Sequence, residues 1–273
     1  MNLEQVLTDL AADPFIPVDL AELNLHLAAD VDSDLDIPVY LSRLDELAER
    51  LTPRLTGDVT SKTAELAHFL FVECGFQGNS SHYYDPRNSY LNEVMDRRLG
   101  IPISLTVLAM RVGSECGLNV VGVGLPGHFI AKVIDRDAEV LFDPFHGGQL
   151  LDEAGCEDLI SAVTGHPFHA HDDSLAATPP GLIVQRMLNN LKAVYLKSAN
   201  YARAATVIRR LKQVIPGDPS QERDLGVCLL HSGMPGQALG HLQAYLGQMP
   251  GAEDASTVQD LIKDARRQIA RWN

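Results

Sequence analysis

The chain has 273 residues, of which 45% are hydrophobic, and its 22 basic and 36 acidic side chains give a net charge of −14. The apolar content is sufficient for a folded core and argues against disorder along the whole chain. The acidic balance disfavours a protein that binds nucleic acid through its overall field. The charge is uneven, because residues 1–180 sum to −19 and residues 181–273 sum to +5. We therefore expect two modules, with nucleic acid disfavoured most strongly for the first.

The first residues, the apolar stretches and the cysteines of the chain predict a cytoplasmic protein. The first 15 residues lack the basic and apolar regions of a secretory signal. The longest uncharged apolar stretch, 101–110, is shorter than the roughly 20 residues that span a bilayer. The four cysteines lie far apart without a CxxC pair, so nothing in their spacing calls for disulfides. We expect no membrane association and no cofactor.

Residues 1–75 are expected to form the helical N-terminal part of a core domain. Apolar residues recur at helical spacing within 3–10, 39–51 and 64–71. Prolines at 14, 17, 38 and 53 stand where helices would start or break.

The pattern of residues 76–175 predicts that they form the rest of that core domain, with an α+β fold. A polar segment rich in turn-forming residues at 76–100 precedes an apolar helix that starts near Pro102 and ends at about Cys116, with Gly117 as its C-cap. Three strand-like segments follow at 120–125, 129–134 and 140–142, separated by Pro-Gly and by a charged turn at 135–137. A helix followed by antiparallel strands favours α+β over a doubly wound sheet. Residues 151–180 are expected to be a looser stretch ending in a linker.

The last third, 182–273, repeats on itself with a period of 34 residues. Similar apolar residues recur at this spacing in the pairs Ala204 and Ala238, Ile208 and Leu242, Leu211 and Tyr245, and Leu191 and Leu225. A 34-residue period is typical of tetratricopeptide repeats, which are stacked pairs of helices. We predict helices at about 183–198, 201–214, 219–232, 235–248 and 255–271.

Three residues suggest a catalytic constellation. Ser104 lies at the predicted start of the apolar helix, His128 follows Pro-Gly at the start of a strand, and Asp143 follows the next strand. A nucleophile at a helix N-terminus gains from the helix dipole and free N–H groups, a nearby His can take its proton, and an Asp can orient that His. Taken singly, the Ser could be a helix cap and the Asp a turn former.

Four motifs strengthen this interpretation. They are Tyr-Asp-Pro-Arg-Asn-Ser at 84–89, Arg-Leu-Gly-Ile-Pro-Ile-Ser-Leu at 98–105, Pro-Gly-His-Phe at 126–129 and Asp-Pro-Phe-His-Gly-Gly at 143–148. With them, residues 83–151 closely resemble the transglutaminase-like superfamily, whose core is related to papain-like cysteine proteases. Together with the tail, they resemble a bacterial branch with tetratricopeptide-like repeats that is described as invasion-regulator-like and whose role is poorly defined.

The resemblance implies that His128 is the base and Asp143 the orienting residue of a Cys-His-Asp triad. Ser104 stands where the catalytic Cys is expected, and a hydroxyl is much harder to ionise than a thiol. Two functions therefore stay open. One is a pseudoenzyme that binds a protein or peptide as a regulator or scaffold, through the core groove and the repeats. The other is a Ser-His-Asp hydrolase or acyltransferase acting on a peptide amide or ester.

Candidate binding residues precede the Ser104 helix. Tyr84 could contribute to an aromatic wall for a peptide, and Asn88 and Arg98 could line the pocket, although loop bracing or solvent exposure is the alternative for each.

A His-rich stretch at 165–173 could bind zinc or nickel, but it lacks paired helical spacing and a Pro interrupts it. We therefore expect no metal site.

Overall fold

The computed structural model describes residues 1–136 and 138–271, which form two compact units. We call Met1 and Phe15–Met187 the core unit. We call Asn2–Pro14 and the chain from Leu188 onward the repeat unit. The domain boundaries expected at residues 75 and 175 stay a prediction, and residue 137 of the expected charged turn lies outside the described residues.

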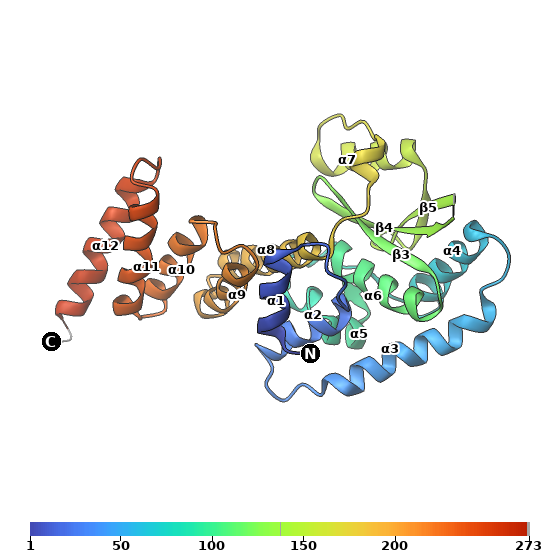
Figure 1. Cartoon of the computed structure of the whole chain (residues 1–273), viewed down its shortest axis with the longest axis horizontal. Helices are drawn as coiled ribbons and strands as arrows, with labels where there is room; N and C mark the ends of the chain where they lie inside the picture. The colour runs from blue at the N-terminus through green and yellow to red at the C-terminus, as the bar shows by residue number, and fades with distance from the viewer. Residues whose placement is uncertain (137, 272–273) are drawn as a thin grey trace. The chain divides into compact units, whose positions relative to one another are not determined.

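Three aspartate-capped helices open the core unit (Figure 1): α2 (Leu20–Ala29), α3 (Ile37–Leu51) and α4 (Val59–His68). The carboxylates of Asp19, Asp36 and Asp58 accept first-turn backbone N–H groups, which have no partner inside the helix. A π-helical turn, Phe69–Glu73, continues α4. The apolar spacing does not reveal α2, because it is buried almost all round and so lacks an amphipathic period.

Two helices then flank a short parallel ribbon. The segment η3 (Pro86–Asn88) leads into α5 (Leu91–Arg97), and β1 (Gln77–Gly78) pairs with β2 (Leu99–Gly100). The next helix, α6 (Pro102–Glu115), has Cys116 as its C-cap, and Gly117 follows at φ 78°, close to the predicted end. Gly100 is required at the start of α6, because a Cβ there would lie 2.8 Å from Cγ of Leu105 and 2.9 Å from Oγ of Ser104.

An antiparallel sheet in the order β3-β4-β5-β6 completes the α+β fold, as predicted. Its strands are β3 (Asn119–Leu125), β4 (His128–Asp135), β5 (Ala138–Asp143) and β6 (Gln149–Leu151). The last strand was not predicted, because three residues are too few for a visible alternation.

The two faces of the sheet pack against different helices (Figure 1). Side chains alternate between faces along each strand. Val123, Ile130 and Leu141 cluster with buried residues of α7 (Glu153–Thr164). On the opposite face α6 approaches closely, since a Cβ on Gly113 would lie 2.4 Å from Val120.

The helix α7 corrects the expectation of a loose stretch after residue 151. Asp152 caps its start by accepting the Gly155 N–H at 2.8 Å, and Gly165 ends it in the left-handed region at φ 74°. Only Cys156 and Ile160 are buried in this helix. Two buried positions one turn apart are too weak a period to predict it from sequence.

The repeat unit consists of helices whose register follows the 34-residue period. After α8 (Pro180–Lys197) come α9 (Tyr201–Val214), α10 (Ser220–His231), α11 (Pro235–Gln248) and α12 (Ala255–Ala270), close to the predicted bounds. The equivalent residues Ala204 and Ala238, and Ile208 and Leu242, are all fully buried. The periodicity thus marks the packed faces of stacked helices.

The N-terminal helix α1 (Leu3–Ala12) also belongs to the repeat unit, where it packs on α9. Its apolar face, Leu3, Leu7 and Leu10, is buried. The period of the C-terminal residues could not show this helix, because it lies far away in sequence.

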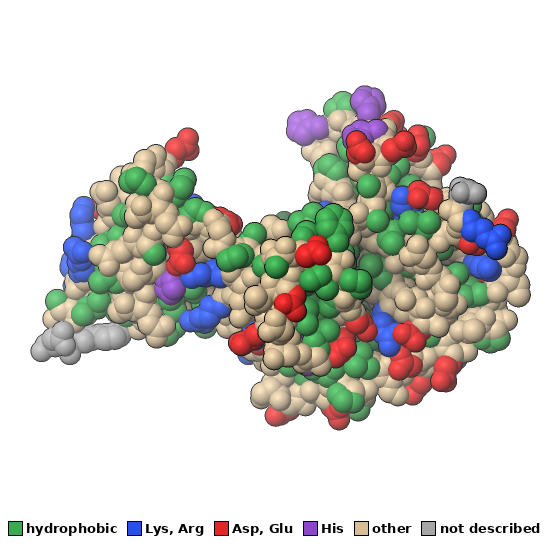
Figure 2. Space-filling model, viewed as in Figure 1, with side chains coloured by type: hydrophobic (Ala, Val, Ile, Leu, Met, Phe, Trp, Pro, Cys, Tyr) green, Lys and Arg blue, Asp and Glu red, His purple; other side chains and the backbone are tan. Residues whose placement is uncertain are grey.

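Among the described residues, no helix is both long and apolar enough to cross a membrane. Histidine side chains gather on the surface over the segment that follows α7 (Figure 2), where His166, His169 and His171 are exposed.

Candidate functional site

Two imidazoles converge on one carboxylate at the end of β5. His128 and Asp143 are both buried, and Nε2 of His128 lies 2.9 Å from Oδ2 of Asp143. His146 places its Nδ1 2.6 Å from the same Oδ2. The side chain of His146 is 47% exposed. The cluster therefore combines a buried acid–imidazole pair with a second imidazole that reaches the surface.

The Asp143 carboxylate is held in place on both oxygens. The backbone N–H of Phe145 donates to Oδ1 at 2.9 Å. Burial by itself raises the pKa of Asp143, but the hydrogen bonds and charges of His128 and His146 outweigh it and leave the pKa below its ordinary value. Asp143 is therefore a carboxylate at neutral pH, able to accept from both rings.

Aromatic rings line the cluster on one side. The Phe145 ring packs edge-on against His128 and His146, with centroids 6.0 and 5.1 Å away. It also contacts Tyr83 at 6.2 Å, and burial raises the pKa of the Tyr83 hydroxyl. The candidate binding residue Tyr84 packs on Tyr83 at 5.4 Å and is 53% exposed. Tyr84 thus lies at the outer edge of an aromatic wall.

Ser104 is occupied by backbone groups at the start of α6. The side chain is buried, and its Oγ donates to the carbonyl oxygen of Asn88 at 2.6 Å. The same Oγ accepts the Ile101 N–H at 3.0 Å, which caps the helix. Among the described residues, no hydrogen bond joins Ser104 to His128. The hydroxyl therefore acts as a brace between two loops in this conformation.

The two parts of the expected triad lie on different elements of the core unit. His128 pairs with Leu125 and, by alternation, shares a face with Ile130, which packs toward α7. Burial raises the pKa of the Cys156 thiol on α7 to about 11, with smaller contributions from carboxylates that include Asp143. Ser104 lies in the first turn of α6.

Asn88 and Arg98 have contacts that brace the fold. Asn88 is fully buried, and its Nδ2 donates to the carbonyl oxygen of His82 at 2.8 Å while its Oδ1 accepts from Asn79 at 3.0 Å. Arg98 caps α5 in the left-handed region, with its guanidinium 4.4 Å from the centre of the Phe76 ring. The structure thus brings His128 and Asp143 together, links Asn88 to Ser104, and gives Arg98 a packing partner outside the cluster.

Two residues of the site were not singled out from the sequence. His146 lies in the motif at 143–148, and its position three residues after Asp143 is a usable signal for a second imidazole on that carboxylate. Arg186 of α8 donates from Nη2 to the carbonyl oxygens of Leu125 and His128. Burial lowers the pKa of Arg186. Its two bonds fix the turn that precedes His128.

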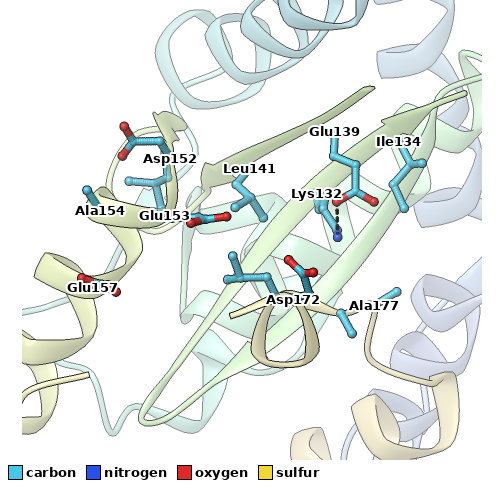
Figure 3. Close-up of a pocket in the computed structure, with 13 residues that line it drawn as sticks. Lys132, Ile134, Glu139, Leu141, Asp152, Glu153, Ala154, Glu157, Asp172 and Ala177 are labelled. Atoms are coloured by element: carbon cyan, nitrogen blue, oxygen red, sulfur yellow. Dashed lines mark hydrogen bonds and ion pairs between the residues drawn. The ribbon is translucent and has the colours of Figure 1, made fainter. Parts of the chain in front are cut away.

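A separate open pocket of about 1150 Å³ lies between the sheet and α7 (Figure 3). Most of its charged groups are carboxylates: Glu139, Asp152, Glu153, Glu157 and Asp172. The single cation in its lining, Lys132, is buried and pairs with Glu139 at 2.6 Å. This acidic lining disfavours an anionic ligand.

Two family models match successive parts of the chain. Residues 38–189 match a model described as transglutaminase-like superfamily, and residues 191–263 match one described as tetratricopeptide repeat. The chain belongs to the transglutaminase-like superfamily. The resemblance and the fold predicted from the sequence are therefore confirmed. The match to the transglutaminase-like domain includes Ser104, His128, Asp143 and His146.

Curated relatives are similar to this chain over different shares of its length. A UPF0162 protein of Xylella fastidiosa, strain Temecula1, is 35% identical over 252 residues, which cover 88% of this chain and 87% of the relative. A UPF0162 protein of Vibrio cholerae is 25% identical over 222 residues, covering 80% and 82%. Human F-box only protein 21 is 28% identical over 132 residues, covering 45% of this chain and 20% of that protein. No solved structure matches the chain.

Proposed function

We propose that the transglutaminase-like domain of this protein binds a peptide segment of a partner without cleaving it, and that the chain acts as a cytoplasmic regulator or scaffold. Tetratricopeptide repeats generally mediate protein–protein interaction, so the pairing of the two domains indicates a protein-interaction role. The four unpaired cysteines fit a reducing compartment.

The hydrogen bonds of the Ser104 hydroxyl are the observation that supports this proposal most strongly. A serine nucleophile needs its proton directed at a base within about 2.6–3.2 Å. The Ser104 Oγ instead lies 2.6 Å from the carbonyl oxygen of Asn88 and 3.1 Å from that of Ile101, and either oxygen can accept its proton. Releasing it would leave the Asn88 carbonyl and the Ile101 N–H with only the 3.4 Å contact between them in a buried place, at a cost of about 1–3 kcal/mol.

The hydrolase or acyltransferase remains the second candidate, supported by the His128–Asp143 hydrogen bond. That pair is the base and orienting group which a Ser-His-Asp site needs. For this function Ser104 would have to rotate away from Asn88 when substrate binds.

A fluorophosphonate probe separates the two candidates on the folded full chain. We expect no labelling of Ser104, with a known serine hydrolase labelled in parallel as the positive control. Labelling that is lost in Ser104→Ala would overturn the non-catalytic proposal and favour the hydrolase.

The binding role is tested by proximity cross-linking in the source cells, followed by direct affinity measurement with the purified partner. Tyr84→Ala removes an exposed aromatic ring without touching the core, so we expect it to weaken binding, whereas the exposed Val163→Ala on α7 serves as the control. A partner bound equally well by wild type and by Tyr84→Ala would contradict a role for the aromatic wall.

A further inference from the structure

The second imidazole on Asp143 is more than an orienting pair requires. A base–orienter pair uses one ring and one carboxylate. Here His128 and His146 both direct a ring nitrogen at the same oxygen, Oδ2, at 2.9 and 2.6 Å. Their rings stack with centroids 5.6 Å apart and planes 25° from parallel. Two imidazole nitrogens thus lie close to one carboxylate oxygen.

Imidazole nitrogens and carboxylate oxygens are common ligands of zinc-class ions. The three ligand atoms lie within 4.8 Å of one another. In a tetrahedral zinc site such atoms are about 3.3 Å apart, given bond lengths of about 2.0–2.1 Å. To bind zinc, the three ligand atoms would have to move to this spacing. His146 would make this movement, because its side chain is half exposed and it follows the end of β5.

The surroundings of the cluster also suit a metal ion. Asp143 and His128 are buried, and the Phe145 N–H donates to Oδ1 as an outer-shell partner that orients a ligand would. The Phe145 ring packs on both imidazoles. Because the side chain of His146 is 47% exposed, water would reach a bound ion from its side.

We propose that His128, Asp143 and His146 bind one divalent transition-metal ion of the zinc class, with an open fourth position. Each imidazole would coordinate through the nitrogen that now faces Asp143 and carry its proton on the other ring nitrogen. This site differs from the His-rich stretch at 165–173, whose His166, His169 and His171 are all exposed. It also departs from the expectation, drawn from the sequence, that the protein has no metal site.

The test is zinc binding to the untagged full-length protein, by calorimetry and by metal analysis after dialysis. We expect about one Zn²⁺ per chain. Loss of an outer-shell partner alone weakens metal affinity about 10–100-fold, so removing the ligand in His146→Ala should weaken Kd at least about tenfold. His169→Ala is the matched control, because it removes another exposed histidine, and its Kd should equal that of wild type.

A second variant guards against effects on folding. Asp143→Asn keeps the shape of the side chain and removes its charge, and circular dichroism would confirm that each variant is folded. Co²⁺ bound to wild type should give visible d–d absorption that is absent from folded His146→Ala.

Three outcomes would each overturn the proposal. They are the absence of saturable zinc binding by wild type, an unchanged Kd in His146→Ala, and loss of binding in His169→Ala. None of these outcomes bears on whether Ser104 reacts or Tyr84 contacts a partner, so this inference and the proposed function can fail separately.

Discussion

The core unit and the repeat unit bury different kinds of side chain. Among the described residues, eleven buried polar or charged side chains lie in the core unit and one, Gln221, lies in the repeat unit. Several of these groups in the core unit bond to distant parts of the chain, as Asn24 does to the Leu91 N–H at 2.7 Å. The repeat unit relies on apolar residues at a fixed period. Stability in the core unit should therefore depend on polar partners, and in the repeat unit on the fit of apolar surfaces.

The largest expected effect is at Asp143. Asp143→Ala would leave a buried His128 and the Phe145 N–H without their acceptor. Removing one partner of a buried pair costs roughly 3–5 kcal/mol, and we expect a loss of this size in the free energy of unfolding. Urea denaturation at neutral pH measures it. A loss below about 1 kcal/mol would show that the core unit does not depend on this carboxylate.

Ser104 should be the next most sensitive position. Ser104→Ala removes the acceptor of the Ile101 N–H and the donor to Asn88, so we expect a loss of about 1–3 kcal/mol in the free energy of unfolding. Ser114→Ala, on the same helix but exposed, is the control and should change little. Equal stability of the two variants would contradict the bracing role of Ser104.

Gly226 tests the apolar fit of the repeat unit. A Cβ at this position of α10 would lie 2.7 Å from Cγ and 3.1 Å from the backbone nitrogen of Leu242 on α11. Such overpacking typically costs 1–3 kcal/mol, so Gly226→Ala should lower the melting temperature.

Gly240→Ala is the matched control for Gly226→Ala, because Gly240 also lies in a helix of this unit but faces open space. Replacing it should stabilise the protein by about 0.5–1 kcal/mol, since glycine loses more backbone freedom on folding than alanine. Destabilisation of the same size by both substitutions would show that the Leu242 contact does not set the cost.

The smallest effect is expected at Glu222, a polar contact within the repeat unit. Burial raises the pKa of this carboxyl, but hydrogen bonds from Lys212 and His241 outweigh it and leave the pKa below its ordinary value. A lowered folded-state pKa stabilises the protein above the ordinary pKa of about 4.3, and this stabilisation is lost as the pH falls through the folded value.

Wild type should therefore exceed Glu222→Gln in the free energy of unfolding by about 0.5–1 kcal/mol at neutral pH, and the difference should vanish in acid. Thermal melts of both proteins from pH 7 to about pH 3 measure it. A difference that persists at the acid end would mean that the effect is not one of charge.

His146 shows why much of the candidate site could not be predicted. The motif at 143–148 identified the segment, but which nitrogen faces which oxygen depends on how β4 and β5 pair and end. Ser104 shows the converse. Its place at the helix start was predicted correctly, yet its hydroxyl is bound to a carbonyl 16 residues away in sequence.

The sequence by itself determined the helices α8 to α12, the helix α6 and the first three strands of the sheet. It also suggested the hypothesis that His128 pairs with Asp143. These features follow from local periods and motifs, because apolar spacing records which face of an element is buried. Only the tertiary structure decided that Asn2–Pro14 join the repeat unit, that α7 covers the sheet, that Ser104 braces two loops, and that His146 shares the Asp143 oxygen. Each of these depends on contacts between distant segments, and a buried polar group takes whichever partner the fold brings within reach.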